Sequence, residues 1–423
     1  MENNERMLCE KAVLVGLNAD CFKKEDTATY ETLDELEALL ETAGGSCAAK
    51  VLQNRHAPDP HSFIGEGKAQ ELCDLLQTTE ANMVIFDNDL SPSQIRALEE
   101  ITGVTVLDRS ALILDIFAQR AKTAEGRLQV ELAQYQYLLP KLSGMGKSMS
   151  RLGGGIGTRG PGETKLETDR RHSRERINRL QQELAEVRKV RAVQRERRIK
   201  NAVPVVALVG YTNAGKSTLL NQLTDAGIPA NNRLFDTLDT TTRRLRISDH
   251  LEVLLSDTVG FIAKLPHHLV EAFKATLEEL EYADLLIHVI DASDPQRQAH
   301  IEVVERLIEK LAKPDVPVIR CYNKADLLDD PNLCPIGERC VTTCARNGVG
   351  LDALLSCIES VLLGKLHHVT LLLPYGEAGA LELLHDQAQV LKTDYTAQGI
   401  EVETICSETL YGKLRRYIKE QEA

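Results

Sequence analysis

The residues best suited to chemistry form one loop, Gly210 to Ser217, which reads Gly-x-x-x-x-Gly-Lys-Ser. The loop follows an apolar run, Val205 to Val209, and precedes a helical pattern that starts near Thr218. In such a loop, backbone N–H groups surround a β-phosphate, Lys216 neutralises phosphate oxygens and the Ser217 hydroxyl binds Mg²⁺. A plain glycine turn before a helix is the alternative, and the strand–loop–helix context disfavours it. The loop predicts a nucleotide site.

A second motif, Asp257-Thr258-Val259-Gly260, follows the apolar run Leu251 to Leu255. A carboxylate at the end of a strand can bind Mg²⁺ through water, and the N–H of Gly260 can contact a γ-phosphate. An Asp shortly before a glycine is also common in ordinary turns. Because Asp257 stands about 40 residues behind the first loop, the phosphate-binding role is favoured.

A third motif, Asn323-Lys324-Ala325-Asp326, follows the strand pattern Val318 to Tyr322. The Asp326 carboxylate can accept hydrogen bonds from N1–H and the 2-amino group of guanine, which adenine does not present. The three motifs in this order predict a Mg²⁺-dependent GTP hydrolase that binds GTP and GDP.

A basic segment precedes these motifs in an otherwise acidic chain. The formal charge of the chain is −13, yet residues 141–200 hold 17 Lys and Arg against 7 Asp and Glu. Apolar residues at helical spacing on either side predict an antiparallel helical hairpin over 122–200, with a glycine-rich tip at 143–162 that carries Arg151 and Arg159. A solvated linker and a solvated helix face are the alternative. The coincidence of hairpin, positive charge and glycine favours contact with RNA phosphates.

The expected fold is a multidomain α/β protein. A small, mostly parallel α/β domain should occupy 1–121, and a P-loop GTPase (G) domain should occupy 201–365. A small α+β domain should occupy 366–423, with two strands and two helices: Val369–Leu373, Ala378–Leu384, Val402–Cys406 and Leu410–Ile418.

Composition excludes several other classes of protein. The ten cysteines form no Cys-x-x-Cys pair, which indicates reduced thiols in a cytoplasmic protein. The longest apolar runs have strand length, so integral membrane association is not expected, although peripheral attachment to a membrane stays open. The net negative charge argues against DNA binding, and we expect a monomer.

The motifs together resemble the HflX family of ribosome-associated, translation-factor-related P-loop GTPases. The resemblance rests on Gly153 to Thr164, Asp169-Arg170-Arg171 and Asp257 to Phe261, and it extends from about Lys11 to Leu363. It implies binding to the large ribosomal subunit, with the hairpin and its tip reaching ribosomal RNA, and the splitting or rescue of stalled ribosomes under stress. The alternative is a nucleotide-gated regulatory switch that acts on a protein partner.

The resemblance also implies roles for single residues. Thr237 would be the switch threonine that adds a second protein ligand to Mg²⁺, whereas the residues alone leave Thr240, Thr241 and Thr242 open. Phe261 stands where many GTPases carry a glutamine that orients water, so hydrolysis should be slow without a partner. Asn213 either recruits K⁺ or only stabilises the turn. Cys344-Ala345 stands where the family usually has Ser-Ala in the loop that supports guanine.

The complete set of predicted site residues follows from these motifs. The groups expected to act in hydrolysis are Lys216, Thr237 and Gly260, and the expected metal ligands are Ser217, Thr237 and, through water, Asp257. The residues expected to contact the nucleotide are Gly210, Tyr211, Thr212, Asn213, Ala214, Gly215, Lys216, Ser217, Thr218, Phe235, Asp236, Thr237, Leu238, Asp239, Asp257, Thr258, Val259, Gly260, Asn323, Lys324, Ala325, Asp326, Cys344, Ala345 and Arg346.

Overall fold

The computed structural model of the chain falls into two compact units. Unit 1 comprises Met1–Ala185, Asn232–Leu238 and Ala263–Lys274, and unit 2 comprises Glu186–Asn231, Asp239–Ile262 and Ala275–Ala423. The residues that the structure describes are 10–23, 26–142, 161–200, 203–224, 227, 234–235, 237–238, 240–248, 251–264, 279–328, 335, 337–363 and 366–418.

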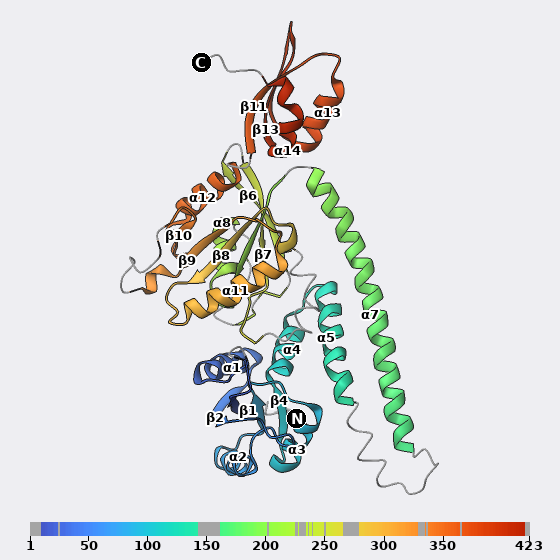
Figure 1. Cartoon of the computed structure of the whole chain (residues 1–423), viewed down its shortest axis with the longest axis vertical. Coiled ribbons are helices and arrows are strands. Elements are labelled where there is room, and N and C mark those ends of the chain that lie inside the picture. The colour runs from blue at the N-terminus through green and yellow to red at the C-terminus, as the bar shows by residue number, and fades with distance from the viewer. Residues whose placement is uncertain are drawn as a thin grey trace, which may run out of the picture. The chain divides into compact units, whose positions relative to one another are not determined.

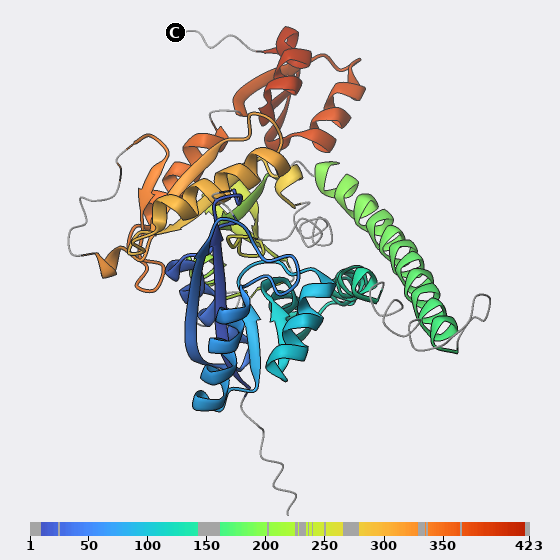
Figure 2. The same cartoon turned by 60° about the horizontal axis from the view of Figure 1, so that its bottom comes forward.

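Unit 1 begins with a four-stranded parallel sheet in the order β2-β1-β3-β4. Helices α1 and α4 pack together, and α2 packs with α3 on the other side of the sheet (Figures 1 and 2). This arrangement confirms the predicted parallel α/β fold. The elements are β1 (Lys11–Ala19), α1 (Tyr30–Ala43), β2 (Ser46–Arg55), α2 (Glu66–Thr79), β3 (Met83–Phe86), α3 (Pro92–Thr102), β4 (Thr105–Asp108) and α4 (Arg109–Arg120).

Local sequence signals explain where these helices begin. Helix α1 starts with a capping box, in which the Thr29 hydroxyl accepts from the N–H of Thr32 and the Thr32 hydroxyl accepts from the N–H of Thr29. Helix α4 is capped by Asp108, the residue before its first turn, whose Oδ1 accepts from the N–H of Ala111 at 2.9 Å. The helix starts thus place Thr32 and Arg109 near the carboxyl edge of the sheet.

Two further helices, α5 (Ala124–Leu142) and α7 (Pro161–Lys200), correspond to the predicted hairpin helices. Leu132 packs against Leu180 and Leu184, and the Arg176 guanidinium donates to both carboxylate oxygens of Glu131 at 2.7 and 2.8 Å. Helix α7 begins at Pro161, so the last two residues of the predicted glycine-rich tip lie in the helix, because Pro is well suited to a first helical position. Residues 143–160, with Arg151 and Arg159, lie outside the described residues.

Unit 2 contains a six-stranded sheet in the order β10-β9-β8-β5-β7-β6 (Figure 1). Every pairing is parallel except that of β6 with β7. Helices α8 and α12 share one apolar core with the sheet, and α11 contributes to a second, smaller apolar cluster. The elements are β5 (Val205–Gly210), α8 (Lys216–Thr224), β6 (Thr241–Ser248), β7 (Leu251–Asp257), β8 (Leu285–Asp291), α11 (Arg297–Leu311), β9 (Val318–Asn323), β10 (Cys340–Thr342) and α12 (Leu351–Leu363).

The end of the chain forms a three-stranded antiparallel sheet in the order β11-β13-β12, with α13 and α14 packed on it. The sequence predicted two of these strands and missed β12. The elements are β11 (Leu366–Leu373), α13 (Ala378–Gln387), β12 (Gln389–Thr396), β13 (Gly399–Ser407) and α14 (Glu408–Leu414). In the described part of the chain, no helix has both the length and the apolar character required to cross a bilayer.

Candidate nucleotide site

The loop from Gly210 to Ser217 joins the end of β5 to the start of α8, as the sequence predicted. Its glycines are required by close approaches. A Cβ atom on Gly210 would lie 2.2 Å from the carbonyl oxygen of Val289, and one on Gly215 would lie 2.2 Å from the amide nitrogen of Asn323. Gly215 has φ +96° and Asn213 has φ +62°, a left-handed conformation that Asn tolerates better than most residues.

Lys216 is buried beneath this loop. Its ammonium group donates to the carbonyl oxygens of Gly210 at 3.0 Å and Tyr211 at 2.8 Å. Burial lowers the pKa of Lys216 to about 8, and the nearby Asp257 carboxylate opposes that shift. An anionic phosphate at this loop would favour the charged ammonium form, which suits the predicted role.

Ser217 and Asp257 lie together where the metal ion was predicted. Ser217 Oγ donates to Asp257 Oδ2 at 2.7 Å, and Asp257, the last residue of β7, has no exposed surface. A hydroxyl and a carboxylate are hard oxygen ligands of the kind that Mg²⁺ prefers, so this pair fits the expected ion. The neighbouring Thr258 hydroxyl donates to the carbonyl oxygen of Leu208 at 2.7 Å, which ties the second motif to β5.

The second motif is also joined to the phosphate loop through its backbone. The N–H of Thr212 donates to the carbonyl of Phe261 at 2.7 Å, and the N–H of Phe261 donates to that of Gly210 at 3.1 Å. A Cβ atom on Gly260 would lie 2.8 Å from Thr212 Cγ2 and 3.1 Å from Lys216 Nζ. Gly260 therefore sits beside the ammonium of Lys216, while the Phe261 ring is 2% exposed and offers no polar atom to orient water.

The residues of the third motif, Asn323 to Asp326, make different contacts. Asn323 Nδ2 donates to the carbonyl of Ala214 at 2.9 Å, and Asn323 Oδ1 accepts from the N–H of Ala345 at the same distance. Asn323 therefore connects the loop Gly210–Ser217 with the loop that is predicted to support the base. The Lys324 ammonium pairs with Asp291 at 2.7 Å.

Asp326, the predicted reader of guanine, has a partner that sequence reasoning did not assign. Cys344 Sγ donates to Asp326 Oδ1 at 3.0 Å. Cys344 is buried just beyond β10, and its backbone N–H donates to the carbonyl of Val349 at 2.9 Å. The signal available in the sequence was the position of Cys344 in the place of a serine, which is also a side-chain donor.

The predicted site residues around Thr237 do not all belong to the unit that holds the three motifs. Phe235, Thr237 and Leu238 belong to unit 1, and Asp236 and Asp239 lie outside the described residues. Thr241 and Thr242, two of the alternatives to Thr237, lie in β6, where the Thr242 hydroxyl is 2.9 Å from that of Ser256. The role of Thr237 as a metal ligand stays a prediction.

Comparison with known families agrees with this geometry. Residues 30–118 match the family described as "GTP-binding GTPase N-terminal", residues 120–198 match "GTP-binding GTPase Middle Region", and residues 205–324 match "50S ribosome-binding GTPase". A GTPase HflX from Caldanaerobacter subterraneus subsp. tengcongensis is 47% identical over 410 residues, covering 97% of this chain and 94% of the relative. The chain belongs to the HflX GTPase family.

Other HflX proteins are similar over most of their length. The GTPase HflX of Escherichia coli (strain K12) is 46% identical over 391 residues, which cover 91% of this chain and 90% of the relative. Among solved structures, the crystal structure of an SsGBP and GDP complex covers 83% of this chain and 98% of its own, with 24% identity and a TM-score of 0.48.

As a member of the HflX family, the chain binds GTP and hydrolyses it to GDP and phosphate. The backbone N–H groups of the loop and Lys216 remain the groups predicted to hold the phosphates, and Asp326 remains the residue predicted to bind the guanine base. Ser217 and Asp257 would hold Mg²⁺, which neutralises charge that develops on the phosphate oxygens. The apolar Phe261 leaves the orientation of the attacking water to another group.

Proposed function

We propose that this HflX family chain acts in the cytoplasm by binding the large ribosomal subunit, and that it splits or rescues stalled ribosomes under stress. The match of residues 205–324 to a family described as "50S ribosome-binding GTPase" carries the proposal. The ribosome would stimulate hydrolysis, which accounts for an active site in which Phe261 replaces a water-orienting polar group.

The side chains of helix α7 support contact with RNA. Arg176 is engaged by Glu131 and fixes α7 against α5, whereas Arg174 and Arg179 are exposed. Exposed guanidinium groups on a rigid helix bind phosphate oxygens without reading sequence. Contact of this kind suits an RNA surface recognised by its shape and backbone.

Nucleotide state would control this binding. Ser217 and Thr237 would both hold Mg²⁺ when the γ-phosphate is present, and the segment around Thr237 would relax after phosphate release. Asn213 is the residue that would recruit K⁺ as an additional positive charge. A comparison of hydrolysis in K⁺ and in Na⁺ tests that role, because a turn-stabilising Asn213 would give equal rates in both.

The proposal is tested by GTP hydrolysis with and without purified large ribosomal subunits at low salt. We expect stimulation of at least about tenfold, because partner-completed GTPases gain far more than that from their activators. Binding to subunits should weaken steeply as salt rises, because phosphate contacts release counterions. If subunits leave the rate unchanged at low salt, the ribosomal role is wrong and a protein partner becomes the better explanation.

A matched pair of variants locates the contact. Replacing Arg174 and Arg179 together by Gln should weaken binding to subunits and reduce its dependence on salt. Replacing Lys310 and Lys313, which are exposed on and just after α11, removes the same charge and should have a smaller effect. Equal loss in both double variants would indicate nonspecific attraction instead of a hairpin contact.

A further inference from the structure

Two short segments from the second half of the sequence belong to the same compact unit as the amino-terminal domain. They are Asn232–Leu238 and Ala263–Lys274. The first contains Thr237, the predicted switch threonine. The second begins at Ala263, two residues after Phe261. Both segments therefore adjoin motifs that sense the γ-phosphate in P-loop GTPases. We call them the nucleotide-sensing segments.

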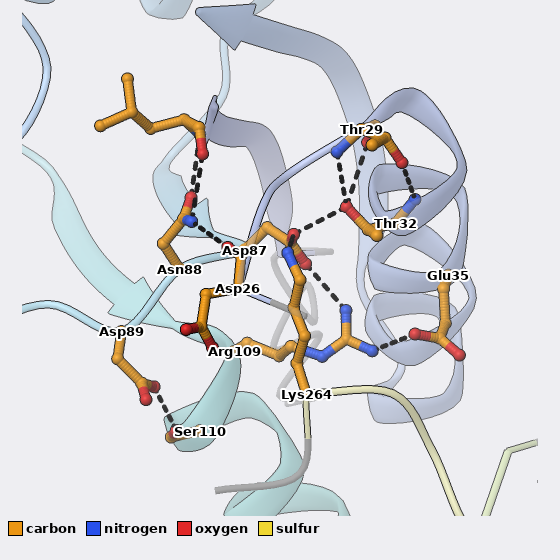
Figure 3. Close-up of polar contacts among 11 residues, drawn as sticks. Asp26, Thr29, Thr32, Glu35, Asp87, Asn88, Asp89, Arg109, Ser110 and Lys264 are labelled. Atoms are coloured by element: carbon orange, nitrogen blue, oxygen red, sulfur yellow. Dashed lines mark hydrogen bonds and ion pairs between the residues drawn. The ribbon is translucent and has the colours of Figure 1, made fainter. Parts of the chain in front are cut away.

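Lys264, at the start of the segment Ala263–Lys274, belongs to a buried ion cluster, which we call the Asp87 cluster: Thr32, Glu35, Asp87, Arg109 and Lys264 (Figure 3). The Lys264 ammonium pairs with Asp87, and Arg109 Nη1 donates to Asp87 Oδ1 at 2.8 Å. The Thr32 hydroxyl donates to Asp87 Oδ2 at 2.7 Å, and Arg109 also pairs with Glu35. The side chain of Lys264 is only 9% exposed, and that of Asp87 is fully buried.

Charge balance in the Asp87 cluster depends on Lys264. Among the described members of the cluster, the cations Lys264 and Arg109 face the carboxylates Asp87 and Glu35, and loss of Lys264 would remove one of these positive charges. A buried excess of negative charge is unfavourable, so the amino-terminal domain favours the position of Lys264 seen here. Asp87 and Arg109 directly follow β3 and β4, at the carboxyl edge of the parallel sheet where α/β domains commonly bind ligands.

In the segment Asn232–Leu238, the described residue Phe235 makes a different, apolar contact. The Phe235 ring packs edge-to-face on the ring of Phe117 in α4, with ring centroids 4.7 Å apart and an interplanar angle of 76°. Phe235 is 3% exposed, and the N–H of the preceding Leu234 donates to the Thr42 hydroxyl at 3.3 Å. Thus α1 and α4 contact Leu234 and Phe235 directly, and they also provide Thr32, Glu35 and Arg109, which surround Asp87, the partner of Lys264.

Both docked residues carry a conformational cost. Phe235 has φ +56° and Lys264 has φ +54°, the left-handed region that bulky residues rarely adopt. Burial also lowers the pKa of Lys264 more than the Asp87 carboxylate raises it, so the ammonium is not fully compensated for its lost hydration. Backbone strain and desolvation oppose docking, and the side-chain contacts favour it. Opposing terms of this kind make a contact reversible.

We propose that Lys264 and Phe235 are positioning residues that dock the nucleotide-sensing segments on the amino-terminal domain and thereby couple that domain to the state of the nucleotide. Lys264 is four residues from Gly260, and Phe235 is two residues from Thr237. Docking of Lys264 and Phe235 therefore limits how far Gly260 and Thr237 can move when a γ-phosphate binds or leaves. Because coupling is reciprocal, any partner that changes docking changes the relative affinity for GTP and GDP by the same factor. The inference rests on the GTPase activity and is independent of the ribosomal role.

The test measures the affinities of the full chain for GDP and for a non-hydrolysable GTP analogue, together with kcat. We expect Lys264→Met and Phe235→Leu each to change the ratio of the two affinities by about fivefold, the lower range of measured allosteric couplings. Lys310→Met, at an exposed position on α11, should leave the ratio and kcat unchanged. A purely structural role for Lys264 would alter the melting temperature and leave the ratio as in wild type.

Double variants make the test specific to the observed contacts. Lys264→Met combined with Asp87→Asn should give the same ratio of the two nucleotide affinities as Lys264→Met alone, because the single variant already removes the contact between the two side chains. If Asp87→Asn does not fold, Phe117→Leu combined with Phe235→Leu provides the equivalent test on the aromatic contact. An unchanged affinity ratio in folded Lys264→Met and Phe235→Leu would overturn the proposal, as would strictly additive effects in the double variants.

Discussion

Cys344 Sγ lies 3.0 Å from Oδ1 of Asp326, so a thiol donates to the carboxylate predicted to read guanine. Burial raises the pKa of the Cys344 thiol, and the hydrogen bond with Asp326 raises it further. The thiol therefore stays protonated near neutral pH and remains a donor. The contact fixes one carboxylate oxygen of Asp326 and so restricts the orientation of the carboxylate that is predicted to bind the base.

This relationship predicts the effect of substitutions at Cys344. Cys344→Ala removes the donor and should weaken GDP binding by about three- to tenfold, equivalent to a net hydrogen bond of about 0.5–1.5 kcal/mol. Cys344→Ser retains a stronger donor and should bind GDP at least as tightly as wild type. Titration calorimetry with GDP measures both, and Cys357→Ala on α12 is the control. Wild-type affinity in Cys344→Ala would show that the thiol does not orient Asp326.

The assignment of Asp326 predicts an exchange of base preference. Asp326→Asn replaces an acceptor with a group that also donates, which suits the 2-carbonyl oxygen of xanthine and not the 2-amino group of guanine. Affinity for GDP should fall by about a hundredfold or more, while affinity for xanthosine diphosphate should rise. Competition between the two nucleotides measures the change. Undiminished preference for guanine would contradict the assignment.

Lys216 is predicted to be essential for phosphate binding. Lys216→Ala removes the only ammonium group placed at the loop carbonyls of Gly210 and Tyr211 in the described structure, so binding of GTP and GDP should be lost. Equilibrium binding of a fluorescent GDP measures this loss. Circular dichroism establishes that the variant is folded, and Lys313→Ala, at an exposed site, should bind normally. Retained binding in folded Lys216→Ala would exclude the predicted role.

His288 predicts a dependence of stability on pH. This residue of β8 is 1% exposed, and burial, together with the positive charges of Arg320 and Lys216, lowers its pKa from 6.5 to about 3. Between pH 6.5 and 3 the unfolded chain binds a proton at this position and the folded chain does not. Titration of His288 therefore leaves the free energy of unfolding unaffected above pH 6.5. As the pH falls from 6.5 toward 3, proton binding to the unfolded chain lowers this free energy by up to about 1.4 kcal/mol per pH unit.

A substitution isolates that contribution. In His288→Leu the unfolding free energy, measured with urea at pH 7 and pH 4.5, should decrease less on acidification than in wild type. His61→Leu, at an exposed histidine, should leave the decrease unchanged. If His288→Leu shows the full wild-type decrease, other groups cause the acid sensitivity.

The sequence alone determined that three motifs, Gly210–Ser217, Asp257–Gly260 and Asn323–Asp326, lie at the ends of apolar strands, and it predicted that they bind phosphate, metal and base. These residues could be predicted because each follows an apolar strand, and the carboxyl ends of neighbouring parallel strands meet at one edge of a sheet. Strand β12 was missed because its register shifts between Val390 and Lys392, which interrupts the period-two alternation that identifies a strand.

Only the tertiary structure decided which side chains meet across long separations in sequence. Cys344 and Asp326 are neighbours because β9 and β10 are paired, and no local pattern states how their following loops approach each other. Lys264 and Asp87 are 177 residues apart, and the sequence around each residue is typical of an ordinary charged residue at the surface. Periodicity and motif spacing report local structure, whereas the pairing of buried charges depends on how distant segments pack.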